Sequence, residues 1–491
     1  MKKDRHFHPL FILVQFINGI KSWLFVFLLA FVVQINNHSI FWIILRYGLV
    51  VLSIFSLLYT FLQWRTTTYR FEDERFILKK GVFSKTRTTI DYDRVQNIQR
   101  ITPAIQKFLG VTSLRFTTAS SASTIELTAI SKQVADELEK FVKKVKKEAK
   151  QNLEEQINDT PIEEIKETEE PKPAILFKAT RKQTIKAAFT SLSFFIVIPV
   201  FLFIFDKGTE LFHLEDVFEE WFELIIASYI FISIAVFILI ILGITFGLIT
   251  TYLKYGRFII SSDEKQIYIQ RGVLSEQSFT IHKKNVQGLQ IKQNIIKRLL
   301  KLREIKLVHI GQGGDEDDSI DSLYPFLGEK DAQGLIKQLL PRFFIEPQLS
   351  KLPKAAFYLH LFSIPYLFIA ALIAMFIWKF SFWWPTGVLI YTIISRSFTY
   401  IFTRYALDGE SIIYKTGAWS TETFITNRNN VIELSFNQGP FQRLFHVCTI
   451  QITTRAQPVH VVNLEHVPVS FAEDVLHWYE KREIQIEHIP N

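Results

Sequence analysis

The sequence lacks the residues that most often mark a reactive or disulfide-bonded protein. Its 491 residues contain one cysteine, Cys448, so no internal disulfide can form, and a reducing cytosolic environment suits the chain. There is no H-E-x-x-H motif, no second cysteine for a zinc site and no G-x-S-x-G elbow to hold a serine nucleophile. We therefore expect no catalytic residue, no metal site and no cofactor, and we do not expect an enzyme.

Two local groupings come closest to a site. His446 and Cys448 lie two residues apart in a predicted strand, which would place them on one face, but no third ligand accompanies them. The segment from His309 to Asp315 is rich in glycine, yet it lacks the G-K-[ST] ending of a phosphate-binding loop and leads into acidic residues. Ordinary packing and a flexible loop are the simpler interpretations, with a weak divalent-cation site as the alternative for the loop.

The composition excludes both a purely soluble and a purely membrane-embedded protein. Apolar residues make up 48% of the chain and charged residues 21%, and no small-residue cleavage site follows the first apolar segment. We expect spanning helices combined with water-soluble modules. Pairs of long apolar segments predict three membrane hairpins, at residues 9–63, 184–253 and 354–403.

Two basic residues interrupt the first hairpin. For residues 9–33 we prefer one long tilted helix with Lys21 reaching the surface; the alternative is an interfacial segment followed by a span that begins at Ser22. Arg46 lies near the outer end of the second span. Either it reaches the outer surface or it is a functional charge inside the membrane.

The basic residues beside the hairpins predict their orientation. Lys and Arg gather at the N-terminus, after the second span and before the third, whereas the loops on the opposite side hold almost none. We therefore expect a multi-pass protein of the cell membrane, with both termini and all soluble modules in the cytoplasm.

A pattern of turns and apolar residues occurs three times in the chain. Each copy has a glycine, a valine 14 residues later and a basic residue 26 residues after the glycine. These are Gly81, Val95 and Lys107; Gly272, Val286 and Arg298; and Gly417, Val431 and Arg443. Two spacings held across three copies indicate a repeated domain. The lysine before the first glycine becomes Thr416 in the third copy, and Trp419 stands where the first copy has Phe83.

The repeats predict three modules of one fold, at residues 65–150, 254–342 and 404–484. Short runs with period-two alternation, such as Arg75 to Lys79 and Thr449 to Thr453, predict half-buried strands. An amphipathic helix closes each module; in the first, Leu138 and Val142 fall on one apolar face. We expect a small β-roll plugged by its C-terminal helix, three times over.

The segment at residues 151–175 differs from everything around it. It has no aromatic residue, is dense in glutamate and ends in Pro171-Lys172-Pro173. This composition predicts a disordered acidic linker between the first and second modules.

The hairpin-plus-roll unit resembles the bacterial pleckstrin-homology-like (PH-like) domain of membrane proteins. The resemblance rests on the turn from Lys80 to Ser84 and the block from Ile105 to Val111, and the three-hairpin layout is similar to the YdbT-type proteins of Gram-positive bacteria. It implies six transmembrane helices, three cytosolic PH-like domains and a role in envelope-stress or antimicrobial-peptide protection. Smaller one-domain relatives imply a membrane-protein partner of the same kind. The family offers no catalytic residues to carry over.

Charge differs strongly between the copies. Residues 65–150 hold 18 basic and 10 acidic residues (+8), residues 254–342 hold 15 and 11 (+4), and residues 404–484 together with the C-terminal tail hold 7 and 10 (−3). One electrostatic ligand common to all three is therefore not expected. In the first module a set of basic residues lies close to the bilayer and could bind an anionic lipid headgroup: Lys79, Lys80, Lys85, Arg87, Arg94 and Lys107. The alternative is that these residues serve only solubility and membrane sorting.

Three functions follow from these patterns. The preferred one is a non-enzymatic scaffold for protein–protein interaction, and the second is recognition of anionic lipid by the first module. The third is a membrane transporter, for which the spans offer few charges beyond Arg46, Glu223 and Arg396. No nucleic-acid binding is expected, because the aromatic residues occupy alternating core positions.

Overall fold

The computed structural model describes residues 4–33, 38–72, 74–92, 95–118, 125–157, 173–190, 229–310, 322–345, 348–379, 381–456 and 459–487. The chain divides into two compact units. Unit 1 comprises residues 1–173, 178–259 and 268–280, and unit 2 comprises residues 174–177, 260–267 and 281–491. We describe each unit by itself and keep the name module for the three repeats.

Unit 1 begins with a short strand and a membrane hairpin. The elements are β1 (Arg5–His6), α1 (Leu10–Leu28), a π-helix (Leu29–Val33) and α2 (Ile40–Thr66). The first residues of this hairpin belong to the core of the first module, because Phe7, Phe11 and Val14 are buried there. The expected single helix is therefore present, but its first turns pack on the soluble module.

The first module is the predicted roll closed by a helix. Its strands are β2 (Thr68–Phe71), β3 (Arg75–Lys80), β4 (Thr86–Asp91), β5 (Val95–Thr102), β6 (Val111–Thr118) and β7 (Ile125–Ser131), with α3 (Ala104–Phe108) between β5 and β6 and α4 (Lys132–Ile157) at the end. The first four strands form a sheet in the order β1-β2-β3-β4. Leu138 and Val142 of α4 are buried against Leu114 and Leu127, so the predicted apolar face does close the core.

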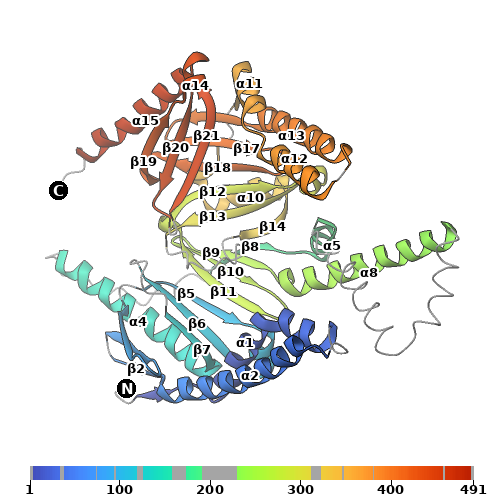
Figure 1. The fold of residues 1–491 in the computed structure, drawn as a ribbon. Helices are drawn as coiled ribbons and strands as arrows, with labels where there is room; N and C mark the ends of the chain where they lie inside the picture. Colours follow the sequence, from blue (N-terminus) through green and yellow to red (C-terminus); the bar gives the residue numbers. More distant parts are fainter. Residues whose placement is uncertain are drawn as a thin grey trace. The chain divides into compact units, whose positions relative to one another are not determined.

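The start of the second module also lies in unit 1. The elements are α5 (Arg181–Thr190), α8 (Tyr229–Tyr255), β10 (Gln266–Arg271) and β11 (Glu276–His282), the last two crossing the boundary between the units. Strand β11 pairs with β5, so the sheet of the first module continues as β7-β6-β5-β11-β10 (Figure 1).

Unit 2 holds the rest of the second module and the whole of the third. Its elements up to the third hairpin are β8 (Ala174–Lys178), β9 (Ile259–Ser262), η3 (Lys283–Asn285), β12 (Val286–Gln293), α9 (Ile295–Leu299), β13 (Leu302–His309), β14 (Ser322–Gly328), α10 (Glu329–Leu339), η4 (Pro341–Phe343) and β15 (Ser350–Lys351). The hairpin helices are α11 (Lys354–Phe362), α12 (Tyr366–Trp378) and α13 (Trp383–Phe402).

The third module follows the hairpin directly. It consists of β16 (Arg404–Asp408), β17 (Ser411–Gly417), β18 (Thr421–Asn427), η5 (Arg428–Asn430), β19 (Val431–Asn437), α14 (Pro440–Leu444), β20 (Val447–Thr454), β21 (His460–Pro468) and α15 (Val469–Glu487). One sheet runs β14-β13-β12-β18-β17-β16-β15 and a second runs β19-β20-β21. Val475 and Trp478 of α15 are buried in the core between them.

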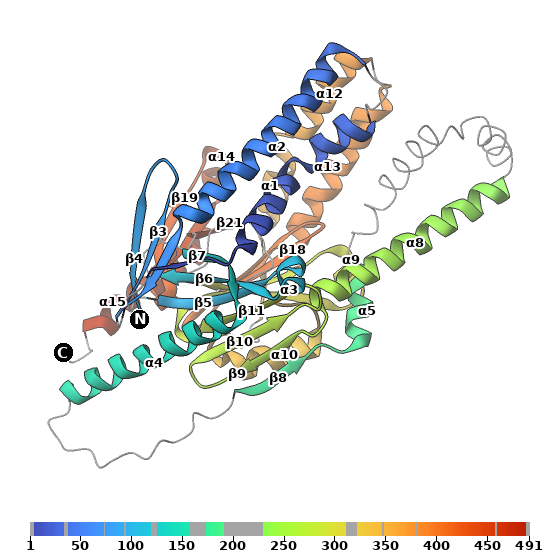
Figure 2. The same ribbon diagram turned by 90° about the horizontal axis from the view of Figure 1, so that it is seen from below.

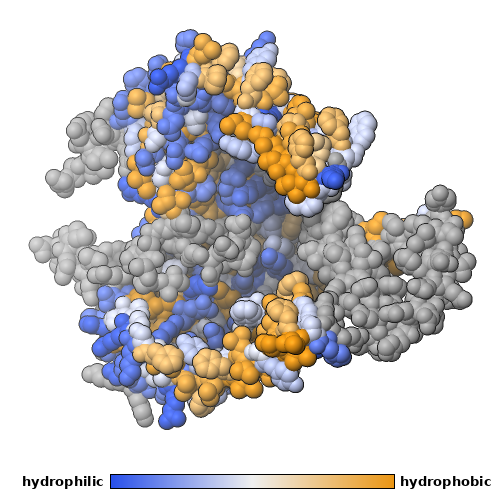
Figure 3. All heavy atoms as spheres, in the orientation of Figure 1, coloured by the Kyte–Doolittle hydropathy of each residue, from blue (hydrophilic) through white to orange (hydrophobic). Residues whose placement is uncertain are grey.

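Among the described residues, three helical segments are long and apolar enough to cross a membrane. They are Leu10–Phe31, Ile40–Thr66 and Lys354–Trp378, and the last is interrupted between α11 and α12. Apolar side chains cover the surfaces of α1, α2, α12 and α13 (Figure 3). Most of the expected third span, residues 185–205, lies outside the described residues, so the count of six spans stays a prediction.

The boundaries of the expected linker differ from the structure at both ends. Helix α4 continues to Ile157 rather than ending at residue 150, and β8 begins at Ala174. Val145, Ala149, Leu153 and Ile157 recur every four residues, a helical spacing that continues the helix into the acidic segment. The central part of the expected linker lies outside the described residues.

The glycine shared by the three copies does occupy a strained turn. Gly81, Gly272 and Gly417 have φ angles of +121°, +96° and +123°. A Cβ at Gly417 would lie 2.0 Å from the carbonyl oxygen of Ser420, and the other two glycines are equally confined by Ser84 and Ser275. Only glycine fits such a turn without displacing backbone.

We therefore expect Gly417→Ala to lower the stability of the protein by about 2 kcal/mol or more, through backbone strain at a positive φ. The measurement is the melting temperature of the purified full-length chain in detergent. Gly334→Ala is the matched control: this glycine lies within α10 with open space around it, so alanine should leave the melting temperature unchanged or raise it slightly. Equal melting temperatures for the two variants would contradict the role of the turn.

Candidate functional site

The most specific surfaces in the structure are sheet edges that join one module to the next. In unit 1, β11 of the second module pairs antiparallel with β5 of the first, with Glu276 facing Thr102 and Phe279 facing Gln99. In unit 2, β18 of the third module pairs with β12 of the second, with Thr421 facing Gln293. In each case the last strand of one module's first sheet binds the first strand of another module's second sheet.

Both pairs use the same register. The residue four positions after the turn glycine, Glu276 or Thr421, faces the residue seven positions after the shared valine, Thr102 or Gln293. A bulge directly after that valine interrupts the pairing with the following strand in all three modules. Because a shift of one residue would turn every side chain to the opposite face, a repeated register indicates a specified interface.

The shared basic residue reaches across each of these edges. The Nζ atom of Lys107 donates to the carbonyl oxygen of Val273 at 2.6 Å and lies 2.6 Å from a carboxylate oxygen of Glu276. Val273 directly follows the turn glycine of the second module. The first module thus holds the turn of the second through a charge-assisted hydrogen bond.

Arg298 makes the equivalent contact in unit 2. Its Nη2 atom donates to the carbonyl oxygens of Ala418 and Trp419, both at 3.3 Å, and its guanidinium lies 4.1 Å from the ring centroid of Phe402. Ala418 again follows the turn glycine. The basic residue found by spacing alone is therefore the one that binds a neighbouring turn.

The same turns also contact membrane helices. The backbone N–H of Val273 donates to the carbonyl oxygen of Leu253 near the end of α8 at 3.1 Å. In unit 2 the Trp419 ring stacks on Tyr391 of α13 with centroids 5.7 Å apart. In the first module the corresponding Phe83 is 87% exposed. Among the described residues, no aromatic ring packs on Phe83 in the turn of the first module.

Of the six residues expected to bind lipid, the structure describes five: Lys79, Lys80, Lys85 and Arg87 lie on the β3–β4 hairpin, and Lys107 lies on α3. Lys79 forms an ion pair with Asp4 at 2.9 Å, and Lys107 is engaged with Val273 and Glu276. Lys80, Lys85 and Arg87 are exposed at the turn between β3 and β4. Figure 2 shows this turn as the projecting tip of the hairpin that the two strands form. Arg94 lies outside the described residues.

Asp4 neutralises part of this basic surface. Its carboxylate accepts hydrogen bonds from Arg70 at 2.6 Å and from Lys79 at 2.9 Å, which lowers the pKa of Asp4 from 3.8 to about 2. Arg5 and His6 next to it pair with Tyr69 and Thr68. The N-terminal segment, expected only as a basic flank, is thus an edge strand of the first sheet.

The two arginines near the membrane bind backbone rather than solvent. Arg46 donates from Nε to the carbonyl oxygen of Ala30 at 2.9 Å, where α1 passes into the π-helix. Arg396 donates to the carbonyl oxygens of Leu361, Ser363 and Ile364, at the break between α11 and α12. Both side chains satisfy carbonyl groups that an interrupted helix leaves open.

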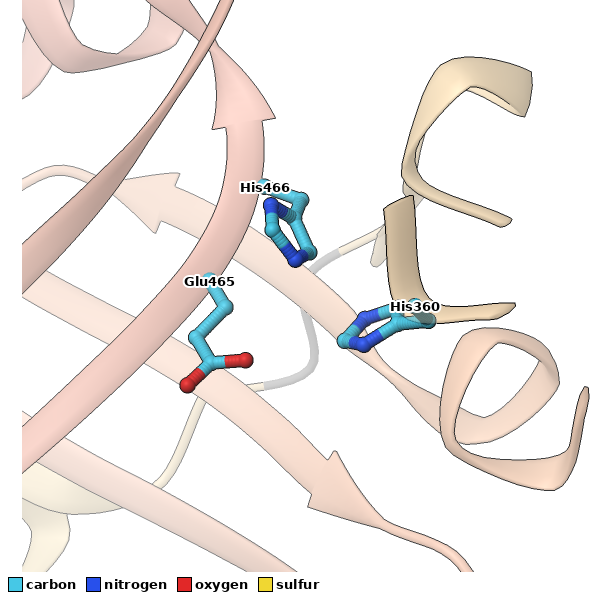
Figure 4. Close-up of side chains that lie close together, drawn as sticks. All are labelled: His360, Glu465 and His466. Atoms are coloured by element: carbon cyan, nitrogen blue, oxygen red, sulfur yellow. The ribbon is translucent and has the colours of Figure 1, made fainter. Parts of the chain in front are cut away.

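Three side chains could hold a metal ion. His360 of α11 and His466 of β21 meet edge to face with ring centroids 4.6 Å apart, and the donor atoms of both histidines and Glu465 lie within 4.8 Å of one another (Figure 4). Burial lowers the pKa of His466, although the neighbouring Glu465 carboxylate acts in the opposite direction. The net lowering favours the neutral imidazole that metal ligation requires. However, Nδ1 of His466 lies 3.0 Å from Nε2 of Gln442, within hydrogen-bond distance. The expectation of no metal site stays a prediction.

The grouping of His446 with Cys448 is wrong. His446 precedes β20 in a left-handed conformation with φ of +52° and is exposed, whereas Cys448 is buried. The two side chains do not share a face because the strand begins only at Val447. The glycine-rich loop lies outside the described residues after Ile310.

The sequence offered a signal for some of these contacts and none for others. The spacing that identified Lys107, Arg298 and Arg443 pointed to a shared role, although not to the partner. His360 and His466 are more than one hundred residues apart, and no local pattern connects them.

Comparisons with known proteins agree with this architecture. The family model described as the bacterial PH domain matches residues 19–146, 210–343 and 354–483. The chain is 23% identical over 498 aligned residues to the UPF0699 transmembrane protein YdbT of Bacillus subtilis (strain 168), covering 98% of each chain. No solved structure matches. The three-fold repeat and the resemblance seen in the sequence are confirmed.

The ion pairs of Asp4 predict a pH-dependent contribution to stability. Because the folded pKa is below the unfolded one, the carboxylate stabilises the fold fully above about pH 4, and this contribution is lost as the pH falls toward 2. We expect Asp4→Asn to lower the melting temperature by about 1–3 °C at pH 7. The difference from the natural chain should shrink between pH 4 and pH 2. Glu473→Gln, at an exposed residue of α15, should cause no such change, and a difference that persists at pH 2 would count against the ion pairs.

Proposed function

The chain belongs to the bacterial PH domain family, and we propose that it is a non-enzymatic membrane scaffold whose PH-like modules bind other proteins. The observation that carries the proposal is the pair of sheet-edge contacts with one register. These modules already recognise folded modules of their own kind, through main-chain hydrogen bonds and one basic side chain. Addition of a strand to a sheet edge is a general mode of protein recognition.

The distribution of charge supports protein partners over one shared small ligand. The modules keep the turn, the valine and the basic residue but differ in net charge from +8 to −3. Such variation is expected where each module has a different binding surface. A role in envelope stress or antimicrobial-peptide protection, implied by the resemblance, remains part of this proposal.

The proposed topology is six spans with both termini and all three modules in the cytoplasm. It is supported by the three long apolar helical segments among the described residues and by the basic flanks in the sequence. Transport is less well supported. The two arginines nearest the membrane that the structure describes, Arg46 and Arg396, are engaged with backbone carbonyls at helix interruptions.

A nucleophilic cysteine is also poorly supported. Cys448 is buried in the core of the third module, and burial raises the pKa of its thiol. Reactive cysteines need the opposite environment, exposed and with a lowered pKa.

The β3–β4 turn supports a second candidate function, binding of anionic lipid. Phe83 is almost fully exposed at the turn, and Lys80, Lys85 and Arg87 surround it. An exposed aromatic ring with adjacent cations suits the interface of an anionic bilayer. The module is tethered next to that bilayer by the hairpin before it.

The scaffold proposal predicts a stoichiometric protein partner. We expect affinity purification of the tagged chain from its native membranes, after brief cross-linking, to recover a second polypeptide in amounts comparable to the chain. A tagged membrane protein of unrelated fold serves as the control. Recovery of the chain without any stoichiometric companion polypeptide would contradict the proposal.

The lipid proposal predicts salt-sensitive binding that depends on the turn. The experiment must use the whole chain, because Phe7, Phe11 and Val14 complete the core of the first module. We expect the chain in neutral nanodiscs to bind added phosphatidylglycerol vesicles, and Lys85→Gln with Arg87→Gln to weaken binding about tenfold or more. Lys132→Gln with Lys140→Gln, on α4, removes the same charge as a control. If both double substitutions weaken vesicle binding equally, the effect is one of general charge, and a specific role of the turn is contradicted.

A further inference from the structure

Each sheet contact between modules joins the last strand of one module's first sheet to the first strand of another module's second sheet. Among the described strands, one strand of each kind has no such partner. Among the described strands, β4 is the last strand of the β1-β2-β3-β4 sheet and has β3 as its neighbour. Strand β19 is the first strand of the β19-β20-β21 sheet and has β20 as its neighbour. By position in the repeat, β4 corresponds to β11 and β18, and β19 corresponds to β5 and β12.

Residues of β19 are accessible at positions where the residues of the corresponding strand β12 are buried. In β12, which pairs with β18, every residue from Val286 to Ile291 is buried. In β19 only Val431 is buried, and the residues after it are exposed or half-buried, including Ile432 at 46% and Phe436 at 38% exposure. The strand carries no lysine, arginine or proline, and Glu433 is the one charged residue that could protect this edge.

The shared basic residue is also unengaged at this end. Lys107 binds the turn that precedes β11, and Arg298 binds the turn that precedes β18. Arg443, by contrast, is exposed and has no ion pair or side-chain hydrogen bond among the described residues. At the other end, the turn that holds Val82 and Phe83 has no basic residue bound to it among the described residues. Among the described residues, the chain thus has one basic residue, Arg443, that binds no turn, and one turn, at Val82 and Phe83, that no basic residue binds.

We propose that β19 of one chain pairs with β4 of a second copy of the chain, in the register of the two internal contacts. That register places Asn437 opposite Thr86, Phe436 opposite Arg87 and Gln438 opposite Lys85. Arg443 then reaches the carbonyl oxygens of Val82 and Phe83. The contact is head to tail, so each copy keeps one open edge of each kind and further copies can add.

The second copy is favoured because it supplies the required edge at the required place. A β4-type edge needs a strand after a left-handed glycine turn, held beside the same membrane, and every copy of this chain carries one. Confinement to one bilayer raises the effective concentration of the two edges. The pairing extends the sheet-edge recognition on which the proposed scaffold function rests.

Two basic residues, Lys85 and Arg87, make this contact weaker than the internal ones. Lys85 occupies the position of Glu276, which forms an ion pair with Lys107, and of Thr421, so it brings a like charge toward Arg443. Arg87 adds a second cation on the same strand. The arrangement gives a reversible association rather than a permanent one, and it makes the strength of pairing adjustable at a single position.

Disulfide cross-linking between two differently tagged full-length copies, co-expressed in membranes, tests the pairing. One copy carries Asn437→Cys and the other Thr86→Cys; a second set carries Phe436→Cys and Arg87→Cys. Consecutive antiparallel pairs alternate between hydrogen-bonded and non-hydrogen-bonded positions, so one set has the short Cα separation that suits a disulfide. Asn437→Cys with Thr89→Cys is the control, on the opposite face and out of register. Copies without introduced cysteines show that the buried Cys448 does not contribute.

We expect a product with both tags from an aligned set and not from the control. Lys85→Glu should raise its yield about threefold or more, by placing a carboxylate beside Arg443, and Arg443→Ser should remove that gain. Equal product from the control, or no product from either aligned set with or without Lys85→Glu, overturns the proposal. A cross-link from Asn437→Cys to a different polypeptide, with none between copies, overturns self-pairing and leaves the scaffold function standing.

Discussion

Hydrogen bonding along sheet edges is the constraint on which the soluble part of this protein depends. A strand at the edge of a sheet exposes unpaired N–H and C=O groups, and these must be paired, covered or protected by charge. Here the edges of β5 and β12 are paired with strands from another module, in one register. The repeats are therefore not structurally independent domains, because strands of one module complete the sheet of another.

The side chains at these edges explain why the copies can diverge. Lys107 and Arg298 bind backbone carbonyl groups of a turn, and a carbonyl is available whatever residue occupies the turn. The residue whose carbonyl group is bound can therefore differ between modules: it is Val273 in one contact and Ala418 in the other. Charge on the neighbouring strand adjusts the strength of the contact without setting its geometry. This explains how modules that share the turn glycine, the valine and the basic residue can differ in the sign of their net charge.

Much of the fold could be predicted from the sequence, because local patterns determine it. The alternating strands, the closing helices and the turn glycines all follow from periodicity and from the φ angles that only glycine tolerates. Pairing between modules could not be predicted, since any edge strand is chemically able to pair with any other. The N-terminal strand was missed for a similar reason: two residues, Arg5 and His6, carry no periodic signal, and their pairing depends on residues brought close by the hairpin.

The short strands that precede the membrane hairpins have a mechanical consequence. Arg5–His6 pairs with the strand that leaves α2, and Ser350–Lys351 pairs with the strand that leaves α13, so each of these hairpins is a loop clamped at both ends in one sheet. Each hairpin is therefore held to its sheet at both ends by main-chain hydrogen bonds, and neither end is free to shift without the other. In the third hairpin only Thr403 separates Phe402 of α13 from Arg404 of β16, so the helix and the sheet are joined with almost no intervening chain.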